Sequence, residues 1–307
     1  MVLCPLQEPD QTGAAAVITR LAIGAIRLVA LMPLPWVRWL GSVVGHVVWI
    51  VVSKRRAVVE ANLRVCFPRL AEAQRRRLVR TVFVRFAQTW MDRGWLWHGS
   101  EQLLRQRLHL RGQDQDIALL RGKAPVLVFA PHFIGLDAGW TALALCLRRP
   151  LATLYTRQSN AVADAWVAQG RQRWGEVRLF RRIDGPKPLL ASLRAGSLLY
   201  LLPDMDFGPR DSVFVPFFGV PAATVTSLSR FAKLGRAKVV PVLARMTSTG
   251  YEVQVMPAWS DFPSDDALAD TIRMNRWLEV QVQADPEQYY WLHRRFKTRP
   301  PGASSIY

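Results

Sequence analysis

The sequence contains few cysteines and histidines. Three cysteines, Cys4, Cys66 and Cys146, lie far apart among 307 residues and form no CxxC pair or Cys/His cluster. This spacing argues against a zinc site and against structural disulfides, and it fits a reducing compartment. The five histidines are scattered as well. We therefore expect neither a bound metal nor another cofactor.

Acidic residues are also scarce. The chain has 23 Asp and Glu residues against 41 Lys and Arg residues, which gives a formal net charge of +18. Such a protein should bind anionic partners, which could be nucleic acid, anionic lipid, a phosphorylated substrate or an acidic carrier protein. No recognised nucleic-acid-binding motif accompanies the arginines, so we do not expect a nucleic-acid partner.

A long uncharged apolar run is missing too. Residues 14–52 are mostly apolar, but Arg20, Arg27, Arg38 and a Pro-Leu-Pro turn interrupt them. A spanning helix needs about 18 to 20 such residues, and the longest clean run here, residues 39–52, is shorter. We expect two helices that lie in or dip into a membrane interface, with tryptophans as anchors and the basic run 54–56 following them.

Two alternatives exist for this segment. A signal peptide fits poorly, because the first residues are not basic and no small-residue cleavage site follows a compact apolar stretch. Ordinary core helices remain possible. The basic run after the apolar residues favours a cytoplasmic location for the remainder. We place a boundary after residue 54, with a membrane-anchor segment at 1–54 and the folded domain at 55–307.

The middle of the chain alternates short apolar runs with helical patterns. A long amphipathic helix is predicted at about residues 70–97. Strands are predicted at residues 125–130, 152–156, 177–180, 197–202, 238–244 and 251–256. Helices are predicted between several of them, at about residues 135–147, 161–174 and 222–234. This alternation predicts an α/β fold with a mixed central sheet flanked by helices.

The most informative chemical pattern follows the first of these strands. His132 comes two residues after the apolar run 126–130, and Asp137 follows five residues later. If His132 lies in the turn and a helix begins near Gly135, Asp137 falls in its first turn and can reach back to the imidazole. The pair would suit general-base chemistry, with Asp137 holding one ring nitrogen of His132 while the other accepts a proton. A histidine that caps a strand end is the alternative.

Other blocks accompany this pattern downstream. They are residues 202–210, which contain Asp204, Asp206 and Arg210, then residues 214–219 and 222–224, and the run 286–300. Together with residues 131–137, these ordered blocks resemble the lipid A biosynthesis lauroyl/myristoyl acyltransferase family, within the wider lysophospholipid and glycerol-phosphate acyltransferase superfamily. The resemblance extends from about Arg55 to the C-terminus, and the apolar N-terminal segment is similar to the family's anchor.

This resemblance implies an acyltransferase domain with a glycerol-phosphate-acyltransferase-like fold and N-terminal membrane-associated helices. It implies acyl carrier protein as the acyl donor and a hydroxyl of a 3-hydroxyacyl chain on a Kdo-bearing lipid A precursor as the acceptor. It also implies a location on the cytoplasmic face of the inner membrane, in contact with its lipids. The family often has Glu where this chain has Asp137, so the shorter side chain is a departure.

Within this interpretation His132 and Asp137 are the catalytic residues. Arg157 and Arg210 are the candidates for binding the anionic head group, since guanidinium groups bind phosphates and carboxylates in bidentate fashion. Asp204 and Asp206 belong to the same substrate-binding region, where they would order the loop or pair with arginines.

Two other functions remain open from the sequence. One is a glycerol-phosphate or lysophospholipid acyltransferase that uses the same chemistry on a smaller acceptor. The other is a basic membrane-binding protein without catalysis. The chain has no GxSxG elbow, Walker A motif or Rossmann glycine pattern, so an acyl-serine intermediate and a nucleotide site are not expected.

Overall fold

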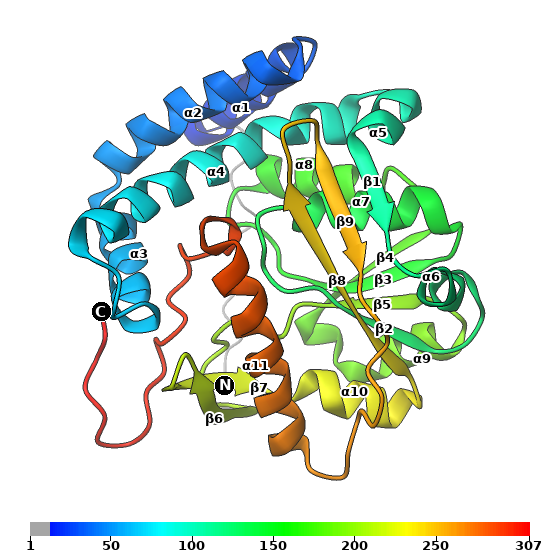
Figure 1. Ribbon diagram of the computed structural model, residues 1–307. Coiled ribbons are helices and arrows are strands. Elements are labelled where there is room, and N and C mark those ends of the chain that lie inside the picture. The colour runs from blue at the N-terminus through cyan, green and yellow to red at the C-terminus, as the bar shows by residue number, and fades with distance from the viewer. Residues whose placement is uncertain (1–12) are drawn as a thin grey trace, which may run out of the picture.

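The computed structural model of the chain describes residues 13–307, so the start of the predicted anchor segment and Cys4 lie outside the described residues. A seven-stranded sheet with the order β1-β9-β8-β2-β5-β3-β4 forms its centre. All neighbouring strands are parallel except β8 and β9, which pair antiparallel. The sheet is therefore mixed, and helices flank it on both faces, as predicted (Figure 1).

All six predicted strands are present in this sheet. They are β2 (Val126–Phe129), β3 (Leu151–Tyr155), β4 (Val177–Arg181), β5 (Leu198–Leu201), β8 (Lys238–Met246) and β9 (Tyr251–Val255). Strand β2 shows why these strands appear in the sequence as continuous apolar runs. Val126 and Val128 face one hydrophobic cluster and Leu127 and Phe129 face another, so all four side chains are buried. A strand covered by helices on both faces needs no polar positions.

The helices supply these two layers. One layer contains α6 (Asp114–Arg121), α7 (Leu136–Leu147) and α8 (Ala161–Gln172). The other contains α9 (Pro186–Arg194), α10 (Ser227–Gly235) and α11 (Ala267–Ala284). The long helix predicted at 70–97 is α4 (Glu72–His98), which α5 (Glu101–Arg107) follows. Short 3₁₀ helices, η1 (Arg182–Asp184) and η2 (Pro286–Gln288), follow β4 and α11.

Three strands were not predicted, and one predicted helix begins too early. Strand β1 (Leu108–Arg111) is four residues long and follows α5 directly, so its pattern merges with the helical one. Strands β6 (Ser212–Phe217) and β7 (Val220–Val225) form a separate hairpin whose strands contain Pro216 and Pro221. The prediction of helix from residue 222 was wrong for 222–225, because these residues pair with β6 instead of continuing α10.

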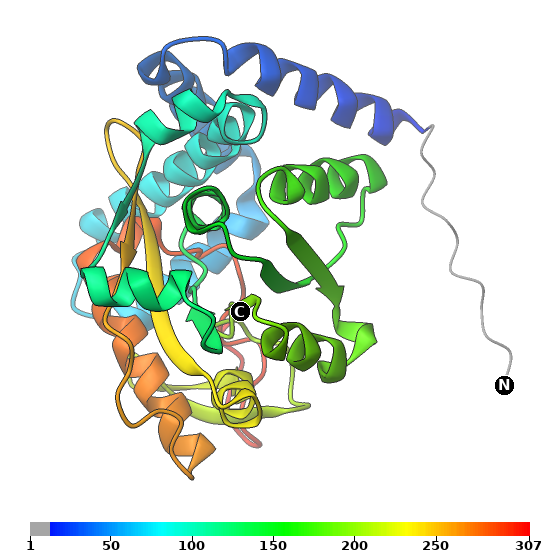
Figure 2. The same cartoon turned by 90° about the vertical axis from the view of Figure 1, so that its right-hand side faces the viewer.

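The apolar N-terminal segment forms two helices, α1 (Ala14–Val29) and α2 (Leu34–Val51), separated at the predicted Pro-Leu-Pro turn. Both contact α4, and α3 (Ser53–Cys66) follows them. Figure 2 shows α1 extending along the edge of the molecule. Among residues 13–307, α2 is the one helix that is long and apolar enough to cross a membrane, by length and composition alone.

Two glycines and one buried ion pair join α2 to the rest of the protein. A Cβ atom at Gly41 would lie 2.8 Å from the Cα of Gln88, and one at Gly45 would lie 2.5 Å from the Cα of Val84. The two helices therefore approach backbone to backbone. Arg38 is buried and pairs with Asp92 on α4 at 3.1 Å. Its guanidinium also donates to the carbonyl oxygens of Thr247 and Gly250 in the β8–β9 turn.

This close approach makes Gly45 sensitive to substitution. We expect Gly45→Ala to lower the free energy of unfolding by about 1–3 kcal/mol, because the added methyl group meets the backbone of α4 and not a mobile side chain. Thermal and denaturant unfolding followed by circular dichroism would measure the change. Gly24→Ala is the matched control, since a Cβ there meets nothing within 4 Å. Equal stability of the two variants would contradict this packing.

Candidate active site

His132 lies just beyond the carboxyl end of β2, in a segment that the C-terminal part of the chain holds in place. The backbone N–H of Tyr290 donates to the carbonyl oxygen of His132 at 2.9 Å, and that of Ile134 donates to the carbonyl oxygen of Gln288 at 2.8 Å. Phe133 and Tyr289 form an antiparallel bridge between these hydrogen bonds. The backbone position of the histidine therefore depends on residues more than 150 positions away in the sequence.

The side chain of His132 forms a hydrogen bond with Asp204. The Nδ1 atom lies 2.7 Å from Asp204 Oδ1, and the backbone N–H of His132 donates to Asp204 Oδ2 at 2.8 Å. Because a carboxylate accepts, Nδ1 carries the proton in the neutral ring, and Nε2 retains its lone pair. The His132 side chain is 17% exposed. The hydrogen bond to Asp204 thus fixes the tautomer of His132. It leaves Nε2 as a basic nitrogen that takes no part in this bond.

Asp204 itself is completely buried and remains ionised. Burial alone would raise its pKa, but the nearby His132, the hydrogen bonds from it and the charge of Arg295 together hold the pKa below its usual value. The hydroxyl of Tyr289 donates to Asp204 Oδ2 at 3.2 Å. Burial and the neighbouring Asp204 raise the pKa of Tyr289 well above its ordinary value, so this hydroxyl stays protonated. Asp204 is therefore a charged, well-oriented partner for an imidazole.

Asp137 has a different set of partners from the one predicted. Helix α7 begins at Leu136 and Asp137 lies in its first turn, as expected. However, its Oδ2 accepts from Arg93 Nη2 at 2.7 Å and its Oδ1 accepts from Arg171 Nε at 2.8 Å. The predicted pairing of Asp137 with His132 is therefore not the one that the structure forms, since Asp204 occupies Nδ1. Two guanidinium groups satisfy both oxygens of Asp137 instead.

The pKa of Asp137 reflects this arrangement. The carboxyl group is fully buried, which alone would raise its pKa, yet the charges and hydrogen bonds of Arg171 and Arg93 hold the pKa below its usual value. Arg93 lies on α4 and Arg171 on α8, so this ion-pair cluster links three helices next to the start of α7. The shared carboxylate fixes how these helices meet.

Gly135 is required for close packing against β8 and not for the turn. Its φ of −78° is ordinary, so the turn itself does not demand glycine. A Cβ at this position would lie 2.4 Å from the carbonyl oxygen of Ala244 on β8. The glycine thus permits close approach of the segment after His132 to the neighbouring strand.

Asp206 organises the loop beside His132. Its Oδ2 accepts from the backbone N–H of Thr298 at 2.6 Å, and its Oδ1 accepts from the Thr298 hydroxyl at 2.9 Å and from the N–H of Gly208 at 2.9 Å. The backbone N–H of Asp206 donates to Nε2 of His293 at 2.9 Å. Across residues 13–307, no group of three or more His, Cys, Asp or Glu side chains is arranged to hold a metal ion.

Arg157 and Arg210 lie in loops at the same edge of the sheet. Arg157 follows β3 and Arg210 follows β5, while His132 follows β2. Since β2, β5 and β3 are adjacent and parallel, the loops at their carboxyl ends meet at one edge. The Arg157 side chain is 71% exposed and its Nε lies 3.5 Å from Asp164 Oδ2; Arg210 is also exposed. Neither side chain takes part in the hydrogen bonds described above for His132, so the substrate-binding roles of Arg157 and Arg210 stay predictions.

Several residues of this site were not singled out from the sequence. Tyr289 and His293 lie within the C-terminal block at 286–300, for which the sequence offers only Arg294, Arg295 and Lys297 as weaker candidates for binding the head group. Arg93 and Arg171 lie on helices. For Arg93, the sequence signal is its position in the tryptophan-rich stretch of α4. A charged side chain in such apolar surroundings needs a partner of opposite charge. Arg295 is 1% exposed and donates to the carbonyl oxygen of Ala223 and the hydroxyl of Thr224.

His293 makes folding sensitive to acid. Burial, the nearby His132 and the charge of Arg295 lower its pKa from 6.5 to about 4. Between these two pH values the unfolded chain binds the proton and the folded protein does not, so stability falls as pH drops below 6.5. The loss from this one group is about 2 kcal/mol at pH 5 relative to pH 7.

We expect His293→Gln to reduce this acid sensitivity, because the amide oxygen can accept the Asp206 N–H and does not titrate. Denaturant unfolding at pH 7 and pH 5 would measure the difference, with His46→Gln at an exposed position as the control. An unchanged pH dependence in His293→Gln would show that the imidazole is not buried in its neutral form.

Comparison with known proteins identifies the family. The sequence model for bacterial lipid A biosynthesis acyltransferases matches residues 11–298. The chain is 32% identical to the lipid A biosynthesis lauroyltransferase of Escherichia coli (strain K12) over 296 residues, covering 94% of each chain. It is 28% identical to the palmitoleoyltransferase of that organism over 94% of each chain, and 33% identical to the myristoyltransferase over 83% of this chain and 78% of the relative. The chain therefore belongs to the bacterial lipid A biosynthesis acyltransferase family.

Proposed function

We propose that this protein transfers a fatty acyl chain from acyl carrier protein to a hydroxyl of a 3-hydroxyacyl chain on a Kdo-bearing lipid A precursor, with His132 as the general base. The observation that carries the proposal is the His132–Asp204 pair at the carboxyl edge of the sheet. It supplies a basic nitrogen of fixed tautomer in a partly exposed position. Membership of the family supports lipid A acylation as the reaction.

The chemistry follows from the state of the imidazole. Nε2 of His132 removes the proton of the acceptor hydroxyl as its oxygen attacks the thioester carbonyl carbon. The carbon–sulfur bond then breaks, and the departing thiolate takes the proton back from the imidazolium. Asp204 holds the Nδ1–H throughout and stabilises the positive charge that forms on the ring. A thiolate is a good leaving group, so this direct attack requires no covalent enzyme intermediate.

The surroundings of His132 suit a hydrocarbon chain. The ring of Tyr290 lies 6.5 Å from that of His132, Phe86 lies 5.7 Å from Tyr290, and Trp90 lies 6.1 Å from Phe86, measured between ring centroids. A continuous series of aromatic rings thus leads away from the histidine. Such a surface can cover an acyl chain, which supports a lipid substrate.

The anionic groups of donor and acceptor match the basic surface of the protein. Arg157 and Arg210 are our candidates for the phosphates and sugar carboxylates of the acceptor, because both are exposed and lie in the loops that follow β3 and β5. The net charge of +18 favours an acidic carrier protein as donor. Asp206 contributes by ordering the loop through Thr298 and Gly208.

We place the protein on the cytoplasmic face of the inner membrane. Apolar side chains on α1 and α2 are exposed, and they include tryptophans: Val17, Ile18, Leu21, Leu28, Trp36, Trp39, Val47, Ile50 and Val51. The opposite sides of both helices pack on the protein, and Arg38 is paired within it. This pattern favours helices that lie in the interface over a helix that crosses it.

Replacing His132 tests the proposed base. We expect His132→Ala to lower kcat for acyl transfer by about 10²–10⁴-fold, because the acceptor hydroxyl loses its proton acceptor. The assay would use purified protein, carrier-bound acyl thioesters and a Kdo-bearing lipid A precursor, with the product identified by its mass. Transfer at the wild-type rate by a folded His132→Ala protein would exclude this role.

A pair of substitutions separates the roles of the two acids. Asp204→Asn should lower kcat by about 10²-fold or more and change the pH profile of kcat, since the imidazolium loses its counter-charge. Asp137→Asn should instead destabilise the protein by about 3–5 kcal/mol, because two half-buried guanidinium groups lose their buried carboxylate. Asp265→Asn, at an exposed position, is the control. Wild-type kcat in Asp204→Asn would refute the assignment of Asp204.

A further inference from the structure

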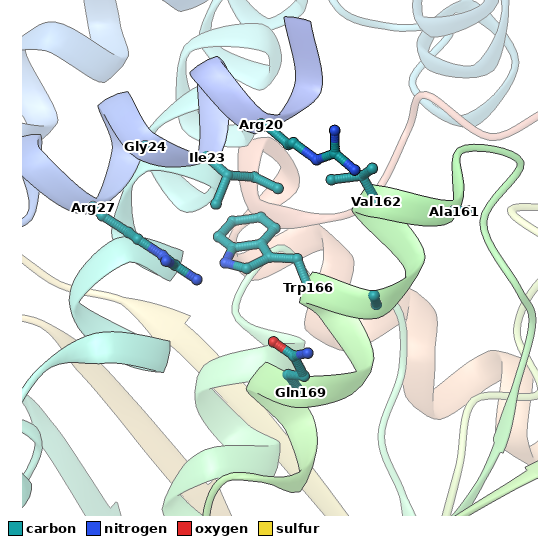
Figure 3. Close-up of a pocket in the computed structure, with 9 residues that line it drawn as sticks. Arg20, Ile23, Gly24, Arg27, Ala161, Val162, Trp166 and Gln169 are labelled. Atoms are coloured by element: carbon teal, nitrogen blue, oxygen red, sulfur yellow. The ribbon is translucent and has the colours of Figure 1, made fainter. Parts of the chain in front are cut away.

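A second feature of interest lies away from His132, in a groove between α1 and α8. The groove has a volume of about 390 Å³. Figure 3 shows Arg20 and Arg27 reaching over it from α1, with Ile23 between them and Trp166 and Val162 of α8 on the other side. The groove thus combines an apolar floor with cationic edges.

The two arginines occupy the same side of α1. They are seven residues apart, close to two full turns, so they project in nearly the same direction about 10 Å apart along the axis. Gly24 lies between them, and a Cβ there would meet nothing within 4 Å. The missing side chain keeps the space between the two guanidinium groups open.

The position of these arginines around the helix is also informative. Ile23 and Ile26 pack against the main hydrophobic core, whereas Leu21 and Leu28 are 69% and 70% exposed. At about 100° per residue, the two arginines fall between the packed side and the exposed apolar side. If the apolar side enters a lipid layer, the guanidinium groups lie at the depth of the phosphates.

The floor of the groove is rigid and adds no negative charge. The Trp166 indole is buried, contacts Trp97 at 4.6 Å between centroids, and donates its Nε1–H to Nε2 of His98 at 2.9 Å. The Nε–H of Arg27 donates to the same His98 nitrogen at 3.2 Å. Burial and the charges of Arg27 and Arg173 lower the pKa of His98 to about 4, so the imidazole is neutral near pH 7. It orients Arg27 without neutralising it.

We propose that the groove between α1 and α8 binds the phosphate headgroup of an anionic phospholipid, with Arg20 and Arg27 as the phosphate ligands. The lipid chains continue along the exposed apolar side of α1. The site is separate from His132, and a lipid bound there serves to seat α1 on the bilayer and is not a substrate. A His132→Ala protein should therefore bind the lipid as the wild type does.

Counting bound lipids tests the proposal. The full chain in nonionic detergent would be titrated with phosphatidylglycerol or phosphatidylcholine, and native mass spectrometry would report the lipid bound to each protein. We expect one phosphatidylglycerol to bind with clear preference over phosphatidylcholine. Arg20→Gln/Arg27→Gln should weaken that binding by about tenfold or more, since two charge-assisted hydrogen-bonding groups are removed.

Two further variants separate the groove from net charge. Arg111→Gln/Arg121→Gln removes the same charge from exposed positions on β1 and α6 and should bind phosphatidylglycerol as the wild type does. Gly24→Leu leaves the charge unchanged and fills the groove, so it should lose the preference. Because Gly24 faces open space, this variant should fold even if the double arginine variant does not.

Three outcomes would overturn the proposal. Equal losses in the two double variants would mean that net charge alone attracts the lipid. Wild-type binding by Gly24→Leu would mean that the lipid lies elsewhere. Displacement of phosphatidylglycerol by an equal concentration of inorganic phosphate would identify a site for free phosphate and not for a lipid.

Discussion

The hydrogen bond between His132 and Asp204 joins the carboxyl ends of two adjacent parallel strands, β2 and β5, and the arrangement around the site depends on it. Asp204 receives this bond while completely buried, which is tolerable because Tyr289 and the backbone of His132 also donate to it. An unpaired carboxylate at this depth would be costly. The C-terminal segment, which supplies Tyr289 and holds the backbone of His132, therefore stabilises the pair.

The requirement that a buried charge has a partner applies to other residues near the site. Charged side chains in apolar surroundings there are matched by partners from distant segments of the chain. Asp137 is neutralised by Arg93 and Arg171, and Arg38 by Asp92. These clusters lie between helices, where both partners are shielded from water. They tie α2, which carries part of the exposed apolar surface, to α4, and they tie α4 to α7 and α8 beside the sheet. The helix with exposed apolar residues and the domain that holds His132 are thus one packed unit.

The aromatic residues connect these two parts. Trp90 contacts both Phe86, in the series that begins at His132, and Trp166, in the floor of the groove between α1 and α8. Aromatic residues of α4, Phe86 and Trp90, therefore connect the proposed lipid site to the proposed catalytic site. Under the proposed function, apolar side chains can cover an acyl chain as it approaches His132.

The sequence by itself determined the α/β fold, the six main strands, the long helix α4, the two N-terminal helices and His132, because these follow from local periodicity and from ordered motifs. It placed Asp137 correctly in the first turn of α7, yet could not show which acid meets the imidazole. That choice depends on strand order, which brings residue 204 beside residue 132, and on two arginines from separate helices that occupy Asp137. Only tertiary structure decides such pairings, since a buried charge is satisfied by neighbours in space and not by neighbours along the chain.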